Sequence, residues 1–120
     1  MRVSNKHVIR NKKTEKKRNL LFFICPFKCN EEWRANVDIL SRYVHIFNNK
    51  IAVCIASGNE IHDYDTVKRY VRRQLGNKKI SWVNVDNNSL LCETQGFIPL
   101  MKIVENTDQR EITFYCHAKG

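Results

Sequence analysis

The chain is poor in glycine and proline and lacks the glycine-rich loops that hold phosphates. It contains four glycines and two prolines in 120 residues, and no glycine lies in the turn after the first apolar segment. The patterns G-x-G-x-x-G and G-x-x-x-x-G-K-[ST] are therefore missing. Their absence argues against an ordinary dinucleotide dehydrogenase and against a P-loop NTPase.

Signals for export and membrane insertion are missing as well. The apolar run Leu20–Cys25 has six residues and is followed by Pro26, so it is too short for the core of a signal peptide. No stretch approaches the ~20 apolar residues of a membrane span. The five cysteines are an odd number, and three of them lie inside apolar strands or at strand ends, which is typical of reduced, buried thiols. These observations predict a cytoplasmic protein.

Positive charge is concentrated at the start of the chain. Of the formal net charge of +9, residues 1–18 supply +7 through eight Lys/Arg and one Glu, whereas residues 19–120 carry thirteen basic and eleven acidic residues. We therefore expect residues 1–18 to form a basic, disordered tail and residues 19–120 to form one domain. Nucleic acid is expected to contact the tail only, because the folded region lacks bulk charge for a polyanion.

Helical spacing appears between the apolar runs. One buried helix face is indicated by residues that recur at intervals of three and four, namely Trp33, Val37, Leu40, Val44 and Phe47. A second helix, capped by Asp63 or Asp65, is expected to end at Gly76. Residues 90–104 predict a third helix that is kinked or split at its internal glycine and proline.

Strands alternate with these helices. Apolar runs predict strands at 20–25, 51–56, 80–85 and 112–116. An alternating order calls for a parallel sheet joined by crossovers. The first two strands are apolar throughout and should be central, which gives the strand order 3-2-1-4. The expected fold is a three-layer α/β structure, a Rossmann-like half-domain.

Polar residues follow each expected strand, where parallel sheets bind ligands. The candidate binding residues near the switch between the first and fourth strands are Pro26, Lys28, Ser57, Asp86, His117 and Lys119. His117 and Lys119 share one face of a strand, so the lysine could meet a phosphate while the histidine donates to a sugar hydroxyl. A phosphorylated or sugar-bearing ligand is therefore one interpretation, and ordinary polar loops are the other.

Two patterns resemble metal sites but have simpler interpretations. Asp63-Tyr64-Asp65 has the D-x-D form that holds a metal and a nucleotide sugar, yet acidic residues before a helix are usually caps. Cys25, Cys29, Cys116 and His117 could approach one another as zinc ligands. However, neighbouring strand residues point to opposite faces, which separates Cys116 from His117. No metal site is predicted, and the catalytic residues stay unassigned.

Several motifs resemble a known family across residues 19–120. They are Asn19-Leu20, Pro26, Trp33-Arg34-x-Asn36-Val37-Asp38-x-Leu40, Phe47-Asn48 and the ending Phe114-Tyr115-Cys116-His117-Ala118-Lys119-Gly120. Together they resemble the start of bacterial glycosyltransferase-like proteins, in which the last strand ends in Y-x-H-[TAN]-K-G. The resemblance implies a sugar-nucleotide-dependent transferase of the A-type fold, with residues 19–120 as its nucleotide-sugar-binding half.

Family members continue past the lysine and glycine into an acceptor-binding and catalytic part. The resemblance therefore implies a truncated N-terminal portion that is not catalytically complete alone. No cofactor motif is visible, and a divalent metal (Mn²⁺ or Mg²⁺) would belong to the full-length protein. The alternative is a small α/β binding module whose basic tail contacts nucleic acid. In either case the fourth strand is left as an edge, which predicts self-association through it.

Overall fold

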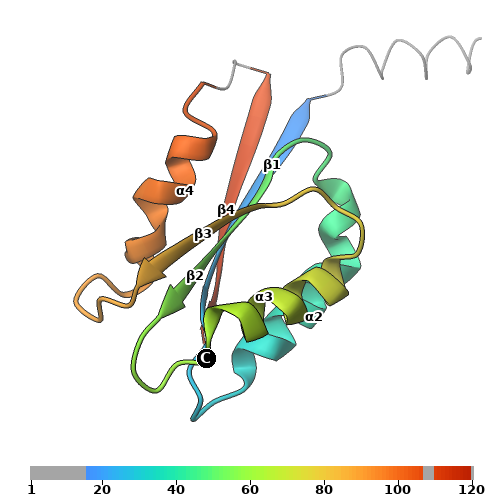
Figure 1. Ribbon diagram of the computed structural model, residues 1–120. Coiled ribbons are helices and arrows are strands. Elements are labelled where there is room, and N and C mark those ends of the chain that lie inside the picture. Colours follow the sequence, from blue (N-terminus) through green and yellow to red (C-terminus); the bar gives the residue numbers. More distant parts are fainter. Residues whose placement is uncertain (1–15, 107–109, 120) are drawn as a thin grey trace, which may run out of the picture.

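The computed structural model describes residues 16–106 and 110–119 and confirms the expected α/β architecture. Four strands form one parallel sheet in the order β3-β2-β1-β4, as the strand hydrophobicity predicts (Figure 1). In chain order the elements are β1 (Lys17–Cys25), α2 (Glu32–Tyr43), the 3₁₀ turn η1 (Val44–Ile46), β2 (Ile51–Ser57), α3 (Tyr64–Leu75), β3 (Ser81–Asp86), the 3₁₀ segment η2 (Cys92–Gly96), α4 (Phe97–Ile103) and β4 (Glu111–Lys119).

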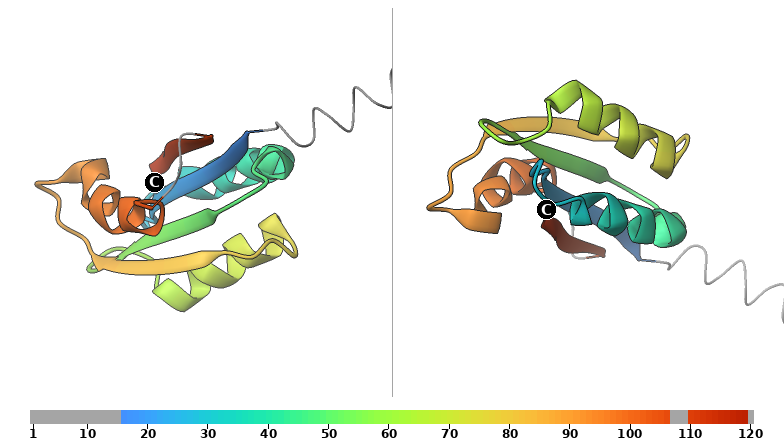
Figure 2. Two further views of the ribbon diagram at one scale, coloured as in Figure 1. Left: turned by 90° about the horizontal axis from the view of Figure 1, so that it is seen from above. Right: turned by 90° about the horizontal axis from the view of Figure 1, so that it is seen from below.

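β1 is buried on both of its faces. Its even-numbered residues from Leu20 to Ile24 pack on the side of α2 and α3, whereas its odd-numbered residues from Leu21 to Cys25 pack on the side of α4. The two views of Figure 2 show these helices on opposite sides of the sheet. Because side chains alternate along a strand, only an unbroken apolar run can fill both cores.

Local signals account for the helices on the first face. α2 buries Trp33 and Val37, which are four residues apart and so share one side of the helix. α3 begins after the Asp63 cap and ends at Gly76, whose φ of 72° is a conformation that glycine adopts at little cost. The helix expected to continue to Phe47 instead ends as α2 at Tyr43 and is followed by the turn η1.

The connection from β3 to β4 consists of two abutting helical pieces, as expected. η2 ends at Gly96 and α4 begins at Phe97. A Cβ atom at Gly96 would lie 2.4 Å from Cδ1 of the buried Phe23 ring, so this joint needs a residue without a side chain. Pro99 is tolerated because it lies in the first turn of α4, where backbone N–H groups have no intrahelical acceptor.

A buried asparagine joins the starts of three strands. Asn19 is fully buried, and its Nδ2 donates to Glu111 Oε1 at 3.0 Å and to Thr113 Oγ1 at 3.2 Å. Its Oδ1 accepts from the backbone N–H of Lys50 at 3.0 Å and from Asn49 Nδ2 at 2.8 Å. Every polar atom of this side chain therefore has a partner, and β1 is tied to both of its neighbours.

β4 extends further than the apolar run 112–116. It pairs with β1 over nine residues, from Glu111 opposite Lys17 to Lys119 opposite Cys25. Backbone pairing does not require apolar side chains, so the ladder continues past the buried segment. β4 has no second partner strand within the described sheet, and Phe114 is 42% exposed.

β1 begins earlier than the expected domain boundary between residues 18 and 19. Lys17 and Arg18 belong to the strand, because both pair with β4. Residues 1–15 of the expected tail lie outside the described residues. Within the described part of the chain, no helix is long and apolar enough to cross a membrane.

We predict that Gly96→Ala lowers the free energy of unfolding by about 1–3 kcal/mol, because the added methyl group overlaps the Phe23 ring. Urea unfolding measures this loss. Combining the change with Phe23→Leu should cost less than the sum of the two single changes, since the smaller side chain leaves room. Strictly additive losses would contradict the packing explanation.

The hydrogen bonds of the buried Asn19 side chain should stabilise the fold. Asn19→Leu should lower the free energy of unfolding by about 2–3 kcal/mol, because it leaves the Lys50 N–H and the Glu111 carboxylate without this partner. The control is Asn48→Ala, which removes an exposed contact to the backbone N–H of Arg18 and should cost about 0.5–1 kcal/mol. Equal losses for the two variants would show that burial of Asn19 does not matter.

Candidate functional site

The carboxyl ends of the four strands form one edge of the sheet, and the candidate residues lie along it. Ser57 and Asp86 are the last residues of β2 and β3 and stand opposite each other in the pairing. Lys119 is the last residue of β4 and stands opposite Cys25. Lys28 lies in the loop that follows β1 and is exposed. The fold thus brings together residues that are far apart in the sequence.

The loops after β1 and β2 are joined by backbone hydrogen bonds. Phe27 and Ile61 form an antiparallel bridge, and the Lys28 N–H donates to the Glu60 carbonyl at 2.9 Å. The Pro26 carbonyl accepts from the His62 N–H, also at 2.9 Å. Pro26 has no N–H, and its carbonyl is used here, so its contribution to the site is to shape the loop.

A network of amides lies behind the ends of β2 and β3. Asn87 donates its N–H to the Ser57 carbonyl at 2.7 Å, and its side-chain oxygen accepts from Gln95 Nε2 at 2.9 Å. The Gln95 oxygen accepts from the Asn88 N–H at 2.7 Å. On the other face, Asn84 Nδ2 donates to Ser57 Oγ at 2.6 Å. These bonds hold the ends of β2 and β3 and the 3₁₀ segment η2 in one arrangement.

His117 and Lys119 alternate with Ala118 on β4. His117 is exposed and stands opposite Phe23, so it shares the α4 side of the sheet with position 119. The Lys119 side chain lies outside the described residues. Ala118 is buried in the core under α2 and α3. The strand therefore separates a buried face from a face that could meet a ligand.

The cysteines near this edge differ in exposure: Cys25 is buried, Cys116 is partly buried and Cys29 is exposed. Cys25 packs on the α4 side and Cys116 packs on the opposite side, as strand alternation predicts. Burial raises the pKa of Cys25 to about 11 and that of Cys54 to about 12, so both thiols are protonated at neutral pH. Among the described residues, no group of three His, Cys, Asp or Glu side chains could hold a metal ion.

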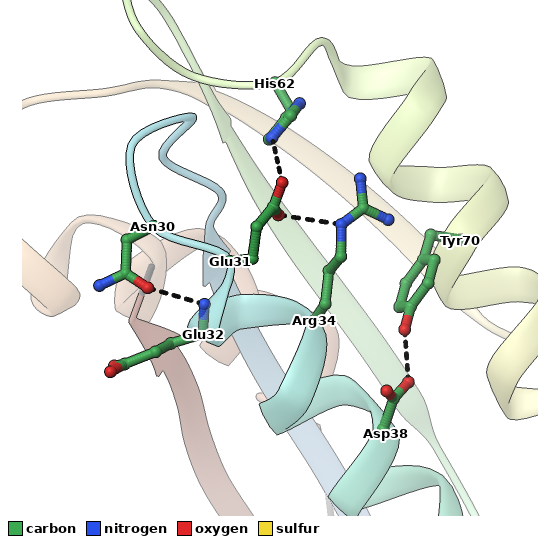
Figure 3. Close-up of polar contacts among 7 residues, drawn as sticks. All are labelled: Asn30, Glu31, Glu32, Arg34, Asp38, His62 and Tyr70. Carbon is green, nitrogen blue, oxygen red and sulfur yellow. Dashed lines mark hydrogen bonds and ion pairs between the residues drawn. The ribbon is translucent and has the colours of Figure 1, made fainter.

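A charged cluster lies where the loops after β1 and β2 meet (Figure 3). Glu31 accepts a hydrogen bond from Arg34 Nε at 2.9 Å, and its other oxygen lies 3.5 Å from His62 Nε2. The bond from Arg34 holds the pKa of Glu31 below its ordinary value. The Arg34 guanidinium also lies 4.6 Å above the Trp33 ring. This cluster joins the start of α2 to the loop that precedes α3.

Asp63 is a helix cap, which is the simpler of the two interpretations of the Asp63-Tyr64-Asp65 pattern. Its carboxylate accepts from the Thr66 N–H at 3.1 Å and from the Asp65 N–H at 3.3 Å, and it also bonds the Thr66 hydroxyl. Hydrogen bonds from the Thr66 side chain and backbone are the main causes that lower the pKa of Asp63. The carboxylate is thus occupied by hydrogen bonds to the first turn of α3.

Acidic side chains outnumber basic ones around this edge. The exposed carboxylates of the loops and first helical turns at this edge are those of Glu31, Glu32, Glu60, Asp63, Asp65 and Asp86. The described cations there are Lys28 and Arg34, and Arg34 is paired with Glu31. Arg69 adds a positive charge that acts on Asp63. A polyphosphate at this edge would therefore meet a net negative field unless a cation accompanied it.

The sequence did not point to His62, Asn84 or Gln95 as parts of this edge. His62 follows β2, Asn84 lies within β3, and Gln95 lies in η2. His62 and Asn84 contact distant segments, whereas Gln95 contacts Asn87 and Asn88, eight and seven residues earlier. No sequence motif marks any of these contacts. The one available signal was the interrupted helical pattern around Gly96, which indicates that η2 turns back toward the sheet.

Comparison of the chain with protein-family models, with curated proteins and with solved structures found no match in any of the three.

The cap leads to a pH-dependent prediction. Because the folded-state pKa of Asp63 is below its ordinary 3.8, its stabilising effect is complete above that pH and is lost as the pH falls through the folded-state pKa. Asp63→Ala should therefore lower the melting temperature by several degrees at neutral pH, and the difference should shrink toward about pH 2. Asp65→Ala removes an exposed carboxylate that caps nothing and should have a smaller effect. A pH-independent difference would argue against the cap.

Proposed function

We propose that this chain binds a nucleotide sugar beyond the carboxyl ends of its strands, as the nucleotide-binding portion of a glycosyltransferase-like protein. The observation that carries the proposal is the parallel order β3-β2-β1-β4, with α2 and α4 on opposite faces. In open sheets of this kind, helices that diverge beside the central strand leave a crevice where nucleotides bind. The motif resemblance of the chain supports the same assignment.

Residues along the crevice suit different parts of such a ligand. Asp86 is an exposed carboxylate at the end of β3, and a carboxylate can accept hydrogen bonds from sugar hydroxyls. Lys28 and Lys119 are the cations that could meet the diphosphate, and His117 could donate to an oxygen beside them. Neighbouring strands are ~4.8 Å apart, so β3 and β4 are separated by roughly 14 Å, which suits an extended ligand.

The surrounding carboxylates determine the expected metal dependence. Two lysines cannot neutralise a diphosphate among six exposed acidic side chains. We therefore expect binding to require Mn²⁺ or Mg²⁺ carried in with the diphosphate. Chemistry on the sugar is not assigned to this chain, because no described residues form a nucleophile and base pair at the crevice.

The prediction is tested with uridine, guanosine and thymidine diphosphates, each with and without Mn²⁺. We expect one of them with Mn²⁺ to raise the melting temperature and to shift the backbone NMR signals of residues 28, 57, 86, 117 and 119. His117→Ala should weaken that binding by about tenfold through loss of a hydrogen bond to a charged oxygen.

Lys102→Ala is the matched control, because Lys102 is exposed in the last turn of α4, away from the crevice. It should bind like the unmodified chain. A folded, monomeric protein that responds to none of the three nucleotides would refute the proposal. Shifts confined to β4, with a rise in oligomeric size, would instead show self-association through the β4 edge.

A further inference from the structure

A band of positive charge runs along α3 and onto the edge of β3. We call it the basic face and define it as Lys68, Arg69, Arg72, Arg73, Lys78 and Lys79. No acidic residue occurs between Thr66 and Val85, whereas six basic ones do. The net charge of residues 19–120 is small although this band is present, because the other residues of that region carry seven basic and eleven acidic side chains.

The six side chains occupy one side of the molecule. The apolar side of α3 faces the core and is formed by Val67, Val71 and Leu75. Arg69 and Arg73 lie on the opposite side of the helix and therefore point outward. Lys68 and Arg72 lean over Trp82 of β3, with their charged groups 5.2 and 5.4 Å from the indole ring. Lys78 and Lys79 lie in the loop between α3 and β3.

The loop before β3 is held against the helix that carries the other cations. Arg72 Nη1 donates to the Lys78 carbonyl at 2.7 Å, which fixes this loop beside the last turn of α3. The band is thus continuous from the helix surface to the start of an edge strand. Within the described residues, none of its six side chains forms an ion pair with a carboxylate.

This arrangement is electrostatically unfavourable for the chain alone. Lys68 with Arg72, and Arg69 with Arg73, are like-charge pairs four residues apart on one helix, and such pairs destabilise a helix. The helix dipole favours Arg72 and Arg73, which lie in the last turn. It does not account for the two lysines outside the helix. Arg69 in the second turn is partly compensated by Asp63, whose pKa it helps to lower. A polyanion would remove the repulsion.

We infer that the basic face binds the phosphate backbone of a nucleic acid. Six cations that form no salt bridge among the described residues, on one helix and the loop after it, match a chain of regularly spaced phosphates. A membrane surface fits less well, because helices that bind lipid present apolar residues beside their charges, and no large exposed hydrophobic residue of the described chain lies on α3 or β3. The inference is independent of the nucleotide crevice, which is lined with carboxylates.

The test measures binding of the full chain to fluorescent oligonucleotides of about 20 residues, as single-stranded RNA and as duplex DNA, over a range of salt concentrations. The tested variant is R69E/R73E, which alters the two outermost cations and leaves the Trp82 contacts intact. We expect its affinity to fall about tenfold or more and the slope of log K against log salt to become shallower by about 1–2.

Two further variants separate this face from other sources of charge. R42E/K102E makes the same charge change on exposed residues of α2 and α4 and should retain most of the binding. Reversal of Arg10, Lys12 and Lys13 reports the contribution of the basic tail. The inference is overturned if R69E/R73E binds like the unmodified chain, or if R42E/K102E loses as much affinity.

Two other results would also show that the basic face does not bind nucleic acid. Absence of binding at low salt overturns the inference, and so does binding to vesicles of anionic lipid without binding to either oligonucleotide. Unchanged melting temperatures show that the variants remain folded. Nucleotide binding in the crevice is measured separately with the diphosphates and is expected to survive in R69E/R73E, so failure of one proposal leaves the other standing.

Discussion

Burial of β1 on both faces is the constraint on which the rest of the structure depends. Its six consecutive apolar residues must be covered from two sides and flanked by two strands. Because of this requirement, α2 and α3 pack on one face of the sheet and α4 packs on the other. It also places β2 and β4 beside β1. Gly96 and Asn19 then act at its two ends: the glycine lets η2 approach Phe23, and the asparagine joins three strand starts.

The same topology divides the molecular surface into two chemically different regions. All three helices follow parallel strands, so their first turns meet at the carboxyl edge of the sheet, where Asp63, Glu31 and Glu32 suit the positive ends of the helices. Cations accumulate instead on α3 and at the start of β3. Our two proposals therefore concern separate surfaces: the carboxyl edge of the sheet, which carries amides and carboxylates, and the basic face, which carries six cations.

Much of the fold could be predicted from the sequence, because the relevant signals are local. The strand order follows from which runs are apolar throughout, the limits of α3 follow from Asp63 and Gly76, and the split before α4 follows from Gly96. The extent of β4 could not be predicted, since backbone pairing with β1 carries it beyond its apolar segment. At the crevice, Ser57, Asp86 and His117 could be chosen as strand-end residues, whereas His62 and Gln95 could not.

The sequence by itself therefore determined the order of strands and helices, the limits of α3, the sheet order and the residues that stand at the strand ends. It determined them because periodicity, caps and glycine conformations act within a few residues of the chain. The tertiary structure alone decided that Glu31 meets His62, that Gln95 holds Asn87, and that six cations share one side with Trp82. Gln95 reaches Asn87 across the turn between β3 and η2, whereas the other contacts join separate elements, and the packing of helices on both faces of β1 brings these elements together.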